Sequence, residues 1–310
     1  MSDPPTSDLL ASKDLLNAEL PDPRFVDDRY LPWLYEQHPS GPAYQDSVDE
    51  DGIRVAHYAL IPQDYRDAHG TVPGVFSLHA VTRTGTQRKG YFLALAKQLY
   101  QRAGEDGRSL AIGMPNANSV GAGVKHLGWR LLGPMPVKLC LRTALRTPHV
   151  EDIPATPEFL GSARFEELTA DLDDYPTTGI TNRWTPEHLR WRLARPHGSY
   201  VVHVSPELVS VSARTVQRGV PAAVVMKLLP RGGRRGPLPA RQVIAAACRY
   251  HRTPIALYAG YNEHVRVRGI RPPHRLKPAP LYILVRALRD GVDQDAVVLS
   301  TYEFLDIDAF

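Results

Sequence analysis

A short sequence pattern that occurs twice constrains the fold of this chain more than any other feature. Residues 29–41 read RYLPWLYEQHPSG, and residues 187–198 read EHLRWRLARPHG. Both carry Leu-x-Trp, a proline five or six residues after the tryptophan, and a glycine two residues beyond that proline. The chain has only 4 tryptophans, so two in matched frames favour a duplication, with chance over a short window as the alternative. The pattern therefore predicts a tandem of two related domains.

The expected division of the chain follows from its length and from one proline-rich stretch. At 310 residues the chain can hold two domains of ordinary size. Residues 146–159, RTPHVEDIPATPEF, contain three prolines and no clear periodicity, as a linker does. We expect a flexible leader over 1–20, a first domain over 21–145, this linker, and a second domain over 160–310.

In each half, strands are followed by a loop, a helix and a further strand. The first half predicts strands at 52–61 and 74–82, a helix at 91–103, a strand at 109–114, a helix at 119–127 and a strand at 136–143. The second half predicts strands at 200–204, 208–215 and 221–229, a helix at 241–251, a strand at 254–259 and a β-rich region from 281 onward. This order predicts an α/β (α+β) fold, with helices packed on mixed, mostly antiparallel sheets.

Charge is distributed unevenly along the chain. Residues 185–290 hold 19 Lys+Arg against 4 Asp+Glu, a net charge of +15, whereas residues 1–184 hold 18 against 24, a net charge of −6. The basic residues are densest between 231 and 277, in RGGRRGPLPAR and HVRVRGIRPPHRLK. Such asymmetry suggests a polyanionic partner, and the alternative is a solvated basic surface balanced by acidic neighbours.

Several classes of protein are not indicated. The 2 cysteines lie far apart, and no CxxC, HxH or HExxH spacing occurs, so we expect two buried thiols and no metal site. No apolar run approaches the roughly 20 residues that a membrane span needs. The N-terminus lacks the basic and apolar regions of a signal peptide. We therefore expect a cytoplasmic protein with no membrane partner.

One stretch has the features of a phosphate site. Residues 82–104, TRTGTQRKGYFLALAKQLYQRAG, change from a turn-rich basic run to a helical pattern directly after an expected strand. The N-terminus of a helix presents unpaired N–H groups, which bind anions. Gly90 lets a ligand approach the backbone closely, and Arg88 and Lys89 add two positive charges.

The same stretch resembles a known family. QRKGYF (87–92) resembles the Q/R-x-x-G-x-G/A loop of GNAT acyltransferases, whose N–H groups bind the pyrophosphate of acyl-coenzyme A (acyl-CoA). RYLPWLYEQHPSG and IGMPNANSVGAGVKHLGWRLLG resemble other parts of one GNAT branch, and together the segments span about residues 23–145 in the expected order. Phe92 stands where the family loop has a small residue. The second half resembles a degenerate GNAT domain, because its loop PRGGRRGPLP lacks the family spacing.

The resemblance implies where the acyl donor binds. The acyl carbonyl and pantetheine arm would contact Ala80, Val81 and Thr82, and the phosphates would contact Gln87, Arg88, Lys89, Gly90 and Tyr91. The thiol end would lie near Asn116, Asn118 and Ser119, of which Asn116 and Ser119 are candidate catalytic residues and Asn118 a donor-binding residue. Asn116 and Ser119 could equally cap the next helix.

The base candidate is His79, since an unperturbed histidine pKa of about 6.5 suits proton removal from an amine. Successive strand residues face opposite sides, so His79 could instead point into packing. In the second half, YNEH (261–264) follows an expected strand, as PNAN (115–118) does in the first half. Glu303, Asp306 and Asp308 form an acidic tail. These groups could serve a site between the domains or be solvated turn and terminal residues.

Three functions are compatible with these observations. The first is an N-acyltransferase that moves an acetyl or other acyl group from acyl-CoA to the amine of a small molecule. The second uses an aminoacyl-tRNA donor, as in the more distantly similar tandem-GNAT aminoacyl transferases, with tRNA bound through residues 231–277. The third is a non-enzymatic binding module, against which the intact first loop argues.

Overall fold

The computed structural model describes residues 7–20, 22–115, 117–142, 149–172, 175–217, 219–232, 236–272 and 281–307. The first half contains α1 (Ser7–Glu19), η1 (Pro23–Val26), α2 (Tyr30–Tyr35), β1 (Tyr44–Glu50), β2 (Ile53–Asp67), β3 (Gly70–Thr82), α3 (Tyr91–Glu105), β4 (Leu110–Gly113), α4 (Ala117–Leu127), β5 (Arg130–Pro134) and β6 (Val137–Leu141). Each strand and helix predicted for this half occurs, with bounds that differ by a few residues.

The second half contains β7 (Glu151–Pro154), α5 (Pro157–Leu160), α6 (Ala163–Thr169), β8 (Ile180–Asn182), α7 (Pro186–Leu193), β9 (Val201–Val204), β10 (Leu208–Gln217), β11 (Val220–Pro230), β12 (Leu238–Pro239), α8 (Arg241–Tyr250), β13 (Ile255–Asn262), β14 (Val265–Arg266), β15 (Tyr282–Ala287), η3 (Gln294–Ala296), β16 (Leu299–Glu303) and η4 (Phe304–Asp306). The predicted strands and helix of this half are likewise present.

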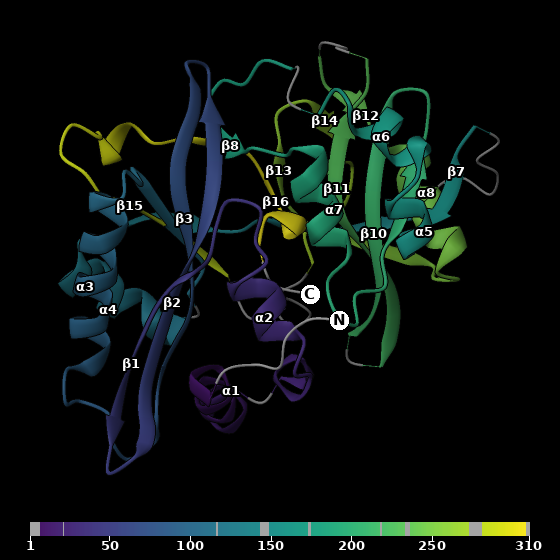
Figure 1. Cartoon of the computed structure of the whole chain (residues 1–310). Helices are drawn as coiled ribbons and strands as arrows, with labels where there is room; N and C mark the ends of the chain where they lie inside the picture. Colours follow the sequence, from purple (N-terminus) through teal and green to yellow (C-terminus); the bar gives the residue numbers. More distant parts are fainter. Residues whose placement is uncertain are drawn as a thin grey trace.

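Most described strands belong to one 14-stranded mixed sheet. Its order is β5-β15-β4-β3-β2-β8-β16-β13-β11-β10-β9-β7, with β1 paired to β2 and β6 paired to β13. Pairing is parallel for β3 with β4, for β11 with β13 and for β16 with β8, and antiparallel elsewhere in this sheet. Figure 1 shows the two halves side by side, joined through β8 and β16. The predicted α/β class is confirmed.

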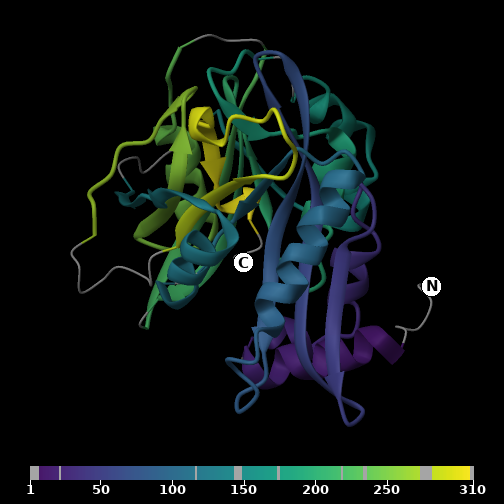
Figure 2. The same ribbon diagram turned by 90° about the vertical axis from the view of Figure 1, so that its left-hand side faces the viewer.

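Helices cover both faces of the first half's sheet. Alternate residues of β2 face opposite sides: Tyr58 packs with α3 and α4, and Ala59 and Ile61 pack with α1 and α2. Figure 2 shows α3 lying along the long strands, with α1 across their lower end. The apolar residues of α3 recur at helical spacing and form its buried face, which includes Leu95, Ala96, Leu99, Tyr100 and Ala103.

The two halves exchange strands. β15, from the second half, pairs antiparallel with β4 and β5 of the first half, with Leu284 opposite Gly113. β6, from the first half, pairs antiparallel with β13 of the second half, with Leu139 opposite Leu257. The sheet of each half is therefore completed by the other, so the strand pairing crosses the division expected at residues 146–159.

The repeated pattern forms the contact between the halves. Trp33 of α2 and Trp191 of α7 stack with ring centroids 4.4 Å apart and an angle of 9° between the planes. Each indole Nε1 donates a hydrogen bond to the main-chain oxygen of the other tryptophan, at 3.1 Å in both directions. The two copies of the pattern thus meet in a reciprocal arrangement.

Two expectations about irregular segments are corrected. Residues 7–19 of the expected flexible leader form α1, because Leu9, Leu15 and Leu16 find apolar partners and are at most 2% exposed. Residues 151–154 of the expected linker form the edge strand β7, which pairs with β9. Residues 1–6 and 146–148 lie outside the described residues.

Three further expectations concern the cysteines, membrane-spanning helices and metal sites. Cys140 and Cys248 are buried and unbridged, and burial raises the pKa of Cys140 to about 11. Within the described ranges, no helix is long and apolar enough to cross a bilayer. Within the same ranges, no cluster of three or more His, Cys, Asp or Glu side chains could hold a metal ion.

Candidate active site

A β-bulge in β3 lies where the acyl carbonyl is expected to bind. Ala59 of β2 is opposite Leu78 and His57 is opposite Val81, so β3 has one extra residue in this interval. His79, inside the bulge, has a φ of 54°, in the left-handed region that non-glycine residues rarely adopt. A bulge leaves a residue unpaired in the ladder, so backbone groups near Ala80 can bind a ligand instead.

The loop after β3 is exposed and leads into the N-terminus of α3. Gly90 is the N-cap residue with a φ of 83°, and no side chain caps the helix there. A Cβ built on Gly90 would meet no atom within 4 Å, and Arg88 and Lys89 are exposed as well. The first N–H groups of this 15-residue helix are therefore accessible to an anion. These features fit a pyrophosphate at the predicted residues.

Buried hydroxyl groups anchor α3 to the sheet. The Tyr58 hydroxyl oxygen lies 2.9 Å from that of Tyr100 and 2.7 Å from Ser77 Oγ. Trp129 Nε1 donates to the Tyr100 hydroxyl at 3.0 Å. Because Tyr58 and Ser77 lie on β2 and β3, this network ties the C-terminal half of α3 to both strands.

One cation of the loop has an acidic neighbour that the sequence reading missed. Lys89 Nζ lies 2.8 and 2.9 Å from the carboxylate oxygens of Glu50, at the end of β1, and the Tyr91 hydroxyl donates to the same carboxylate. The hydrogen bond from Lys89 lowers the pKa of Glu50, so this carboxylate is ionised at neutral pH. Glu50 therefore competes with a phosphate for Lys89.

His79 is both hydrogen-bonded and packed. Its Nδ1 lies 2.7 Å from the Tyr35 hydroxyl, and its ring meets the edge of Phe25 with centroids 5.1 Å apart. Its side chain is half-buried on the face covered by η1 and α2. The expectation that it could point into packing is thus met in part, and its hydrogen bond to Tyr35 fixes the ring orientation.

The candidates at the start of α4 are only partly described. Asn116 lies outside the described residues, and so does the side chain of Asn118, whose backbone is in the first turn of α4. Ser119 is exposed in the same turn. Since α4 begins shortly after β4, these positions lie beyond the carboxyl end of the strand that pairs parallel with β3.

The second half has a bulge at a matching position of β11. Val211 is opposite Lys227 and Ser212 is opposite Val225, which leaves Met226 as the extra residue. Val72-Pro73-Gly74 in β3 matches Val220-Pro221-Ala222 in β11, and this alignment places Lys227 at the position of His79. No sequence signal singled out Lys227, because lysine on a strand is usually a solvated residue.

Lys227 is buried in an ionic cluster formed by the C-terminal segment. It is 1% exposed, and its Nζ lies 2.7 Å from Asp306 Oδ2 and 3.2 Å from Glu303 Oε2. Asp306 also accepts from Trp184 Nε1 at 2.7 Å, and Leu228 N donates to Glu303 at 3.3 Å. Burial raises the pKa of Glu303 to about 7, against the opposing charge of Lys227. The chain itself therefore fills the space beside this second bulge.

The remaining tail and turn candidates have structural partners. Glu263 accepts from Thr177 Oγ1 at 2.8 Å and from Thr178 Oγ1 at 2.6 Å. Asn262 Nδ2 donates to the Leu228 carbonyl at 2.9 Å. Tyr261 and Asn262 are the last residues of β13, so only Glu263 and His264 form a bend before β14, and the interpretation of YNEH as a solvated turn is corrected in part. Asp308 lies outside the described residues.

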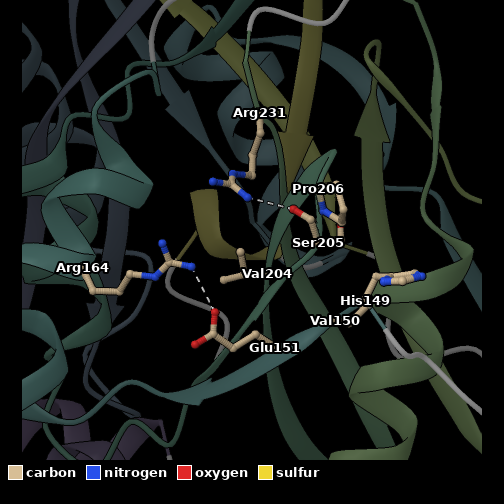
Figure 3. Close-up of a pocket in the computed structure, with 8 residues that line it drawn as sticks. All are labelled: His149, Val150, Glu151, Arg164, Val204, Ser205, Pro206 and Arg231. Carbon is tan, nitrogen blue, oxygen red and sulfur yellow. Dashed lines mark hydrogen bonds and ion pairs between the residues drawn. The ribbon is translucent and has the colours of Figure 1, made fainter.

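A shallow cavity of about 380 Å³ lies on the second half, lined by His149, Val150, Glu151, Arg164, Val204, Ser205, Pro206 and Arg231 (Figure 3). Arg164 pairs with Glu151 at 3.1 Å, and Arg231 donates to the Ser205 carbonyl at 3.0 Å. None of the residues predicted to bind acyl-CoA lines this cavity, whereas Arg231 belongs to the basic segment 231–277.

Comparison with solved structures shows the same fold in N-acetyltransferases. A GCN5-related N-acetyltransferase from Anabaena variabilis matches with a TM-score of 0.62 and 10% identity, over 92% of this chain and 71% of that one. A probable N-acyltransferase of unknown function from Enterococcus faecalis matches with 0.58 and 10%, over 91% and 70%. Eis1 from Mycobacterium abscessus matches with 0.56 and 12%, over 93% and 72%.

No protein-family model matches this sequence, and no curated protein matches it. The structural matches cover most of the chain, so the chain has the fold of the GNAT N-acetyltransferases. The resemblance noted between residues 23 and 145 is confirmed at the level of fold. Because fold does not set function, activity has to be argued from the site.

Proposed function

We propose that this protein is a GNAT-fold N-acyltransferase that moves an acyl group directly from acyl-CoA to an amine of a small molecule. One observation carries the proposal: the bulge of β3, the exposed loop 83–90 and the uncapped N-terminus of α3 are continuous in the chain. Together they offer carbonyl-binding and phosphate-binding groups along one path.

The donor in this proposal is acetyl-CoA or another acyl-CoA. Its pyrophosphate would bind the N–H groups from Gln87 to Tyr91, with Arg88 supplying charge. Its thioester carbonyl would accept from the N–H groups of the bulge near Ala80 to Thr82. Because acyl-CoA is an intracellular metabolite, we expect the reaction to take place in the cytoplasm.

The proposed chemistry is a direct transfer. The amine nitrogen attacks the thioester carbonyl carbon, and the C–S bond breaks. The amine loses one proton to His79, the leaving thiolate takes one proton from solvent, and the imidazolium returns its proton to solvent, so that amide and free coenzyme A result. Asn116, Asn118 and Ser119 are proposed to contact the thiol end of the donor, at the start of α4.

We further propose that the chain is a tandem of two GNAT-like domains, of which the second is degenerate. The reciprocal Trp33–Trp191 contact, the matched bulges and the exchanged strands support a duplication. Lys227, next to the extra residue of the second bulge, forms buried ion pairs with Glu303 and Asp306, and this cluster is proposed to exclude a second donor there. One acyl donor per chain is therefore expected.

The test is calorimetric titration of the whole chain with acetyl-CoA, repeated with the Arg88→Glu variant. We expect one binding site per chain and an affinity at least about tenfold lower for Arg88→Glu, since a charge-assisted contact is lost. Arg241→Glu is the matched control, because Arg241 is exposed at the N-terminus of α8 and should leave this affinity unchanged. No binding by the unmodified chain, or equal effects of both variants, would contradict the proposal.

The alternative donor is an aminoacyl-tRNA, bound through residues 231–277. The net charge of +15 between 185 and 290 supports it, because tRNA binding needs many phosphate contacts. Some of that charge is internal: Arg192 donates to the carbonyls of Leu305 and Ile307, and Lys227 pairs with Asp306. Salt-sensitive binding of total tRNA that Arg241→Glu weakens, without any response to acetyl-CoA, would favour this donor.

A further inference from the structure

The donor loop, residues 83–90, begins with a turn that is closed by its own hydrogen bonds. Thr86 N donates to the Arg83 carbonyl at 3.0 Å, and Thr86 Oγ1 donates to the same carbonyl at 2.9 Å. Gly85, the third residue of this turn, has a φ of 92°, in the positive range that a type II turn requires at this position. Arg83 N donates to the Val55 carbonyl of β2 at 2.7 Å, so the turn continues directly from the sheet. The rest of the loop, which carries predicted phosphate contacts, follows the turn and is exposed.

Glu19, the last residue of α1, holds this turn from outside the loop. Its Oε1 accepts from Thr84 N at 2.9 Å, and its Oε2 accepts from Thr84 Oγ1 at 2.7 Å. Thr84 is the second residue of the turn, so one carboxylate binds both its N–H group and its hydroxyl. These hydrogen bonds lower the pKa of Glu19, so the carboxylate is ionised at neutral pH.

The helix that carries Glu19 is itself held to the sheet. Leu15 and Leu16 are fully buried in the second half of α1. The guanidinium of Arg54, on β2, donates to the Asp8 carbonyl at 2.8 Å and pairs with the Asp8 carboxylate at 2.6 Å. The Arg54 carbonyl accepts from Arg83 Nε at 3.1 Å, so one residue of β2 contacts both α1 and the turn.

The charge of Glu19 and its hydrogen bonds have opposite effects on the proposed donor. A carboxylate that contacts the donor loop repels the anionic pyrophosphate of acyl-CoA, and this holds for Glu19 as it does for Glu50. Glu50, however, pairs with Lys89, which a phosphate would use, whereas Glu19 binds Thr84, which lies outside the predicted phosphate contacts. A turn that is already ordered reduces the conformational entropy lost when the donor binds.

We propose that Glu19 is a positioning residue that fixes the turn of the donor loop and so holds its exposed part in place for acyl-CoA. Glu19 acts through Thr84 rather than on the donor. Its net effect on donor affinity is favourable, despite its negative charge. This inference rests on the proposed function, since it assigns Glu19 a part in acyl-CoA binding.

Two variants of Glu19 separate its hydrogen bonds from its charge. Glu19→Ala removes both acceptors, so the affinity for acetyl-CoA in calorimetric titration should fall by about three- to tenfold. In Glu19→Gln, the amide oxygen can accept from Thr84 N and the amide nitrogen can donate to Thr84 Oγ1. This variant also lacks the charge, so its affinity should equal or exceed that of the unmodified chain. Charge alone predicts tighter binding by Glu19→Ala, and an affinity at or above that of the unmodified chain would overturn the proposal.

Amide hydrogen exchange of the whole chain without donor tests the turn itself. In Glu19→Ala the amides of Thr84 and Thr86 should exchange about tenfold faster or more, whereas the Arg83 amide, bonded to β2, should keep its rate. Asp14→Ala removes a carboxylate from an exposed position of the same helix and should change neither exchange nor affinity. Unchanged exchange at Thr84 and Thr86 in Glu19→Ala, or equal changes in Asp14→Ala, would refute the positioning role. A chain that fails to bind acetyl-CoA contradicts the proposed function, and the exchange rates then still decide whether Glu19 fixes the turn.

Discussion

At the scale of single residues, the pair between Lys89 and Glu50 decides how much positive charge the donor loop offers to a phosphate. Both side chains are partly exposed, with 49% and 31% of their side-chain areas accessible. An exposed pair of this kind is weak and screened by salt. In the proposed complex, the pyrophosphate, with one negative charge on each phosphate, would therefore displace Glu50, although the carboxylate reduces the gain in binding free energy.

The Glu50→Gln variant is therefore expected to bind the donor more tightly. Removal of the carboxylate charge releases Lys89, so the affinity for acetyl-CoA should rise by about two- to fivefold at low ionic strength. The measurement is calorimetric titration at low and high salt, between which the gain should shrink. Glu36→Gln makes the same charge change at an exposed position distant in sequence and should leave the affinity unaltered. Equal affinities for Glu50→Gln and the unmodified chain would exclude this competition.

At the scale of elements, α1 packs against β2 and contacts the loop that follows β3. It buries Leu9, Leu15 and Leu16 in a cluster with Ala59 and Ile61 of β2. Glu19, at the end of α1, accepts hydrogen bonds from Thr84 N at 2.9 Å and Thr84 Oγ1 at 2.7 Å. Ser12 of the same helix contacts His57. A segment expected to be flexible thus contacts both the donor loop and His57.

The packing of α1 is testable by truncating one leucine. Leu16 is fully buried, so Leu16→Ala should lower the free energy of unfolding by about 2–5 kcal/mol through lost burial and a cavity. Urea denaturation gives this difference. Leu10, on the same helix, is 41% exposed, and Leu10→Ala should cost less than about 0.5 kcal/mol. Similar losses for both variants would mean that α1 is not docked as described.

At the scale of the whole molecule, the exchanged strands tie the two halves into one folding unit. β15 lies between β4 and β5, and β6 extends the sheet beside β13. Each half alone would expose an unpaired strand edge and part of its apolar core. The central core cluster likewise includes residues of both halves, such as Phe76 and Val224.

Separated halves are therefore expected not to fold. A fragment of residues 1–145 should lack native near-ultraviolet circular dichroism and be prone to aggregation, because it lacks β15. Co-expression with residues 149–310 should restore a soluble complex, since each fragment then supplies the strand that the other lacks. A fragment 1–145 that unfolds cooperatively by itself would contradict the importance of the exchange.

How much of the structure could be predicted from the sequence depends on how far apart in the chain the interacting residues lie. α3, β3 and the loop between them follow from local patterns, because apolar periodicity and glycine placement act over a few residues. The strand at 136–143 was predicted as a strand, but its partner was not, since a strand pattern does not name its neighbour. Lys227 could not be singled out, because its carboxylate partner Asp306 lies 79 residues away.

The sequence by itself determined the α/β class, the duplicated Leu-x-Trp pattern and the candidate phosphate loop, all of which depend on local or repeated residue order. Only the tertiary structure decided that the halves exchange strands, that α1 is packed, and that Lys227 is buried beside the second bulge. The physical reason is the same in each case. Burial and ion pairing depend on which distant residues meet, and that is set by the whole fold rather than by any short stretch.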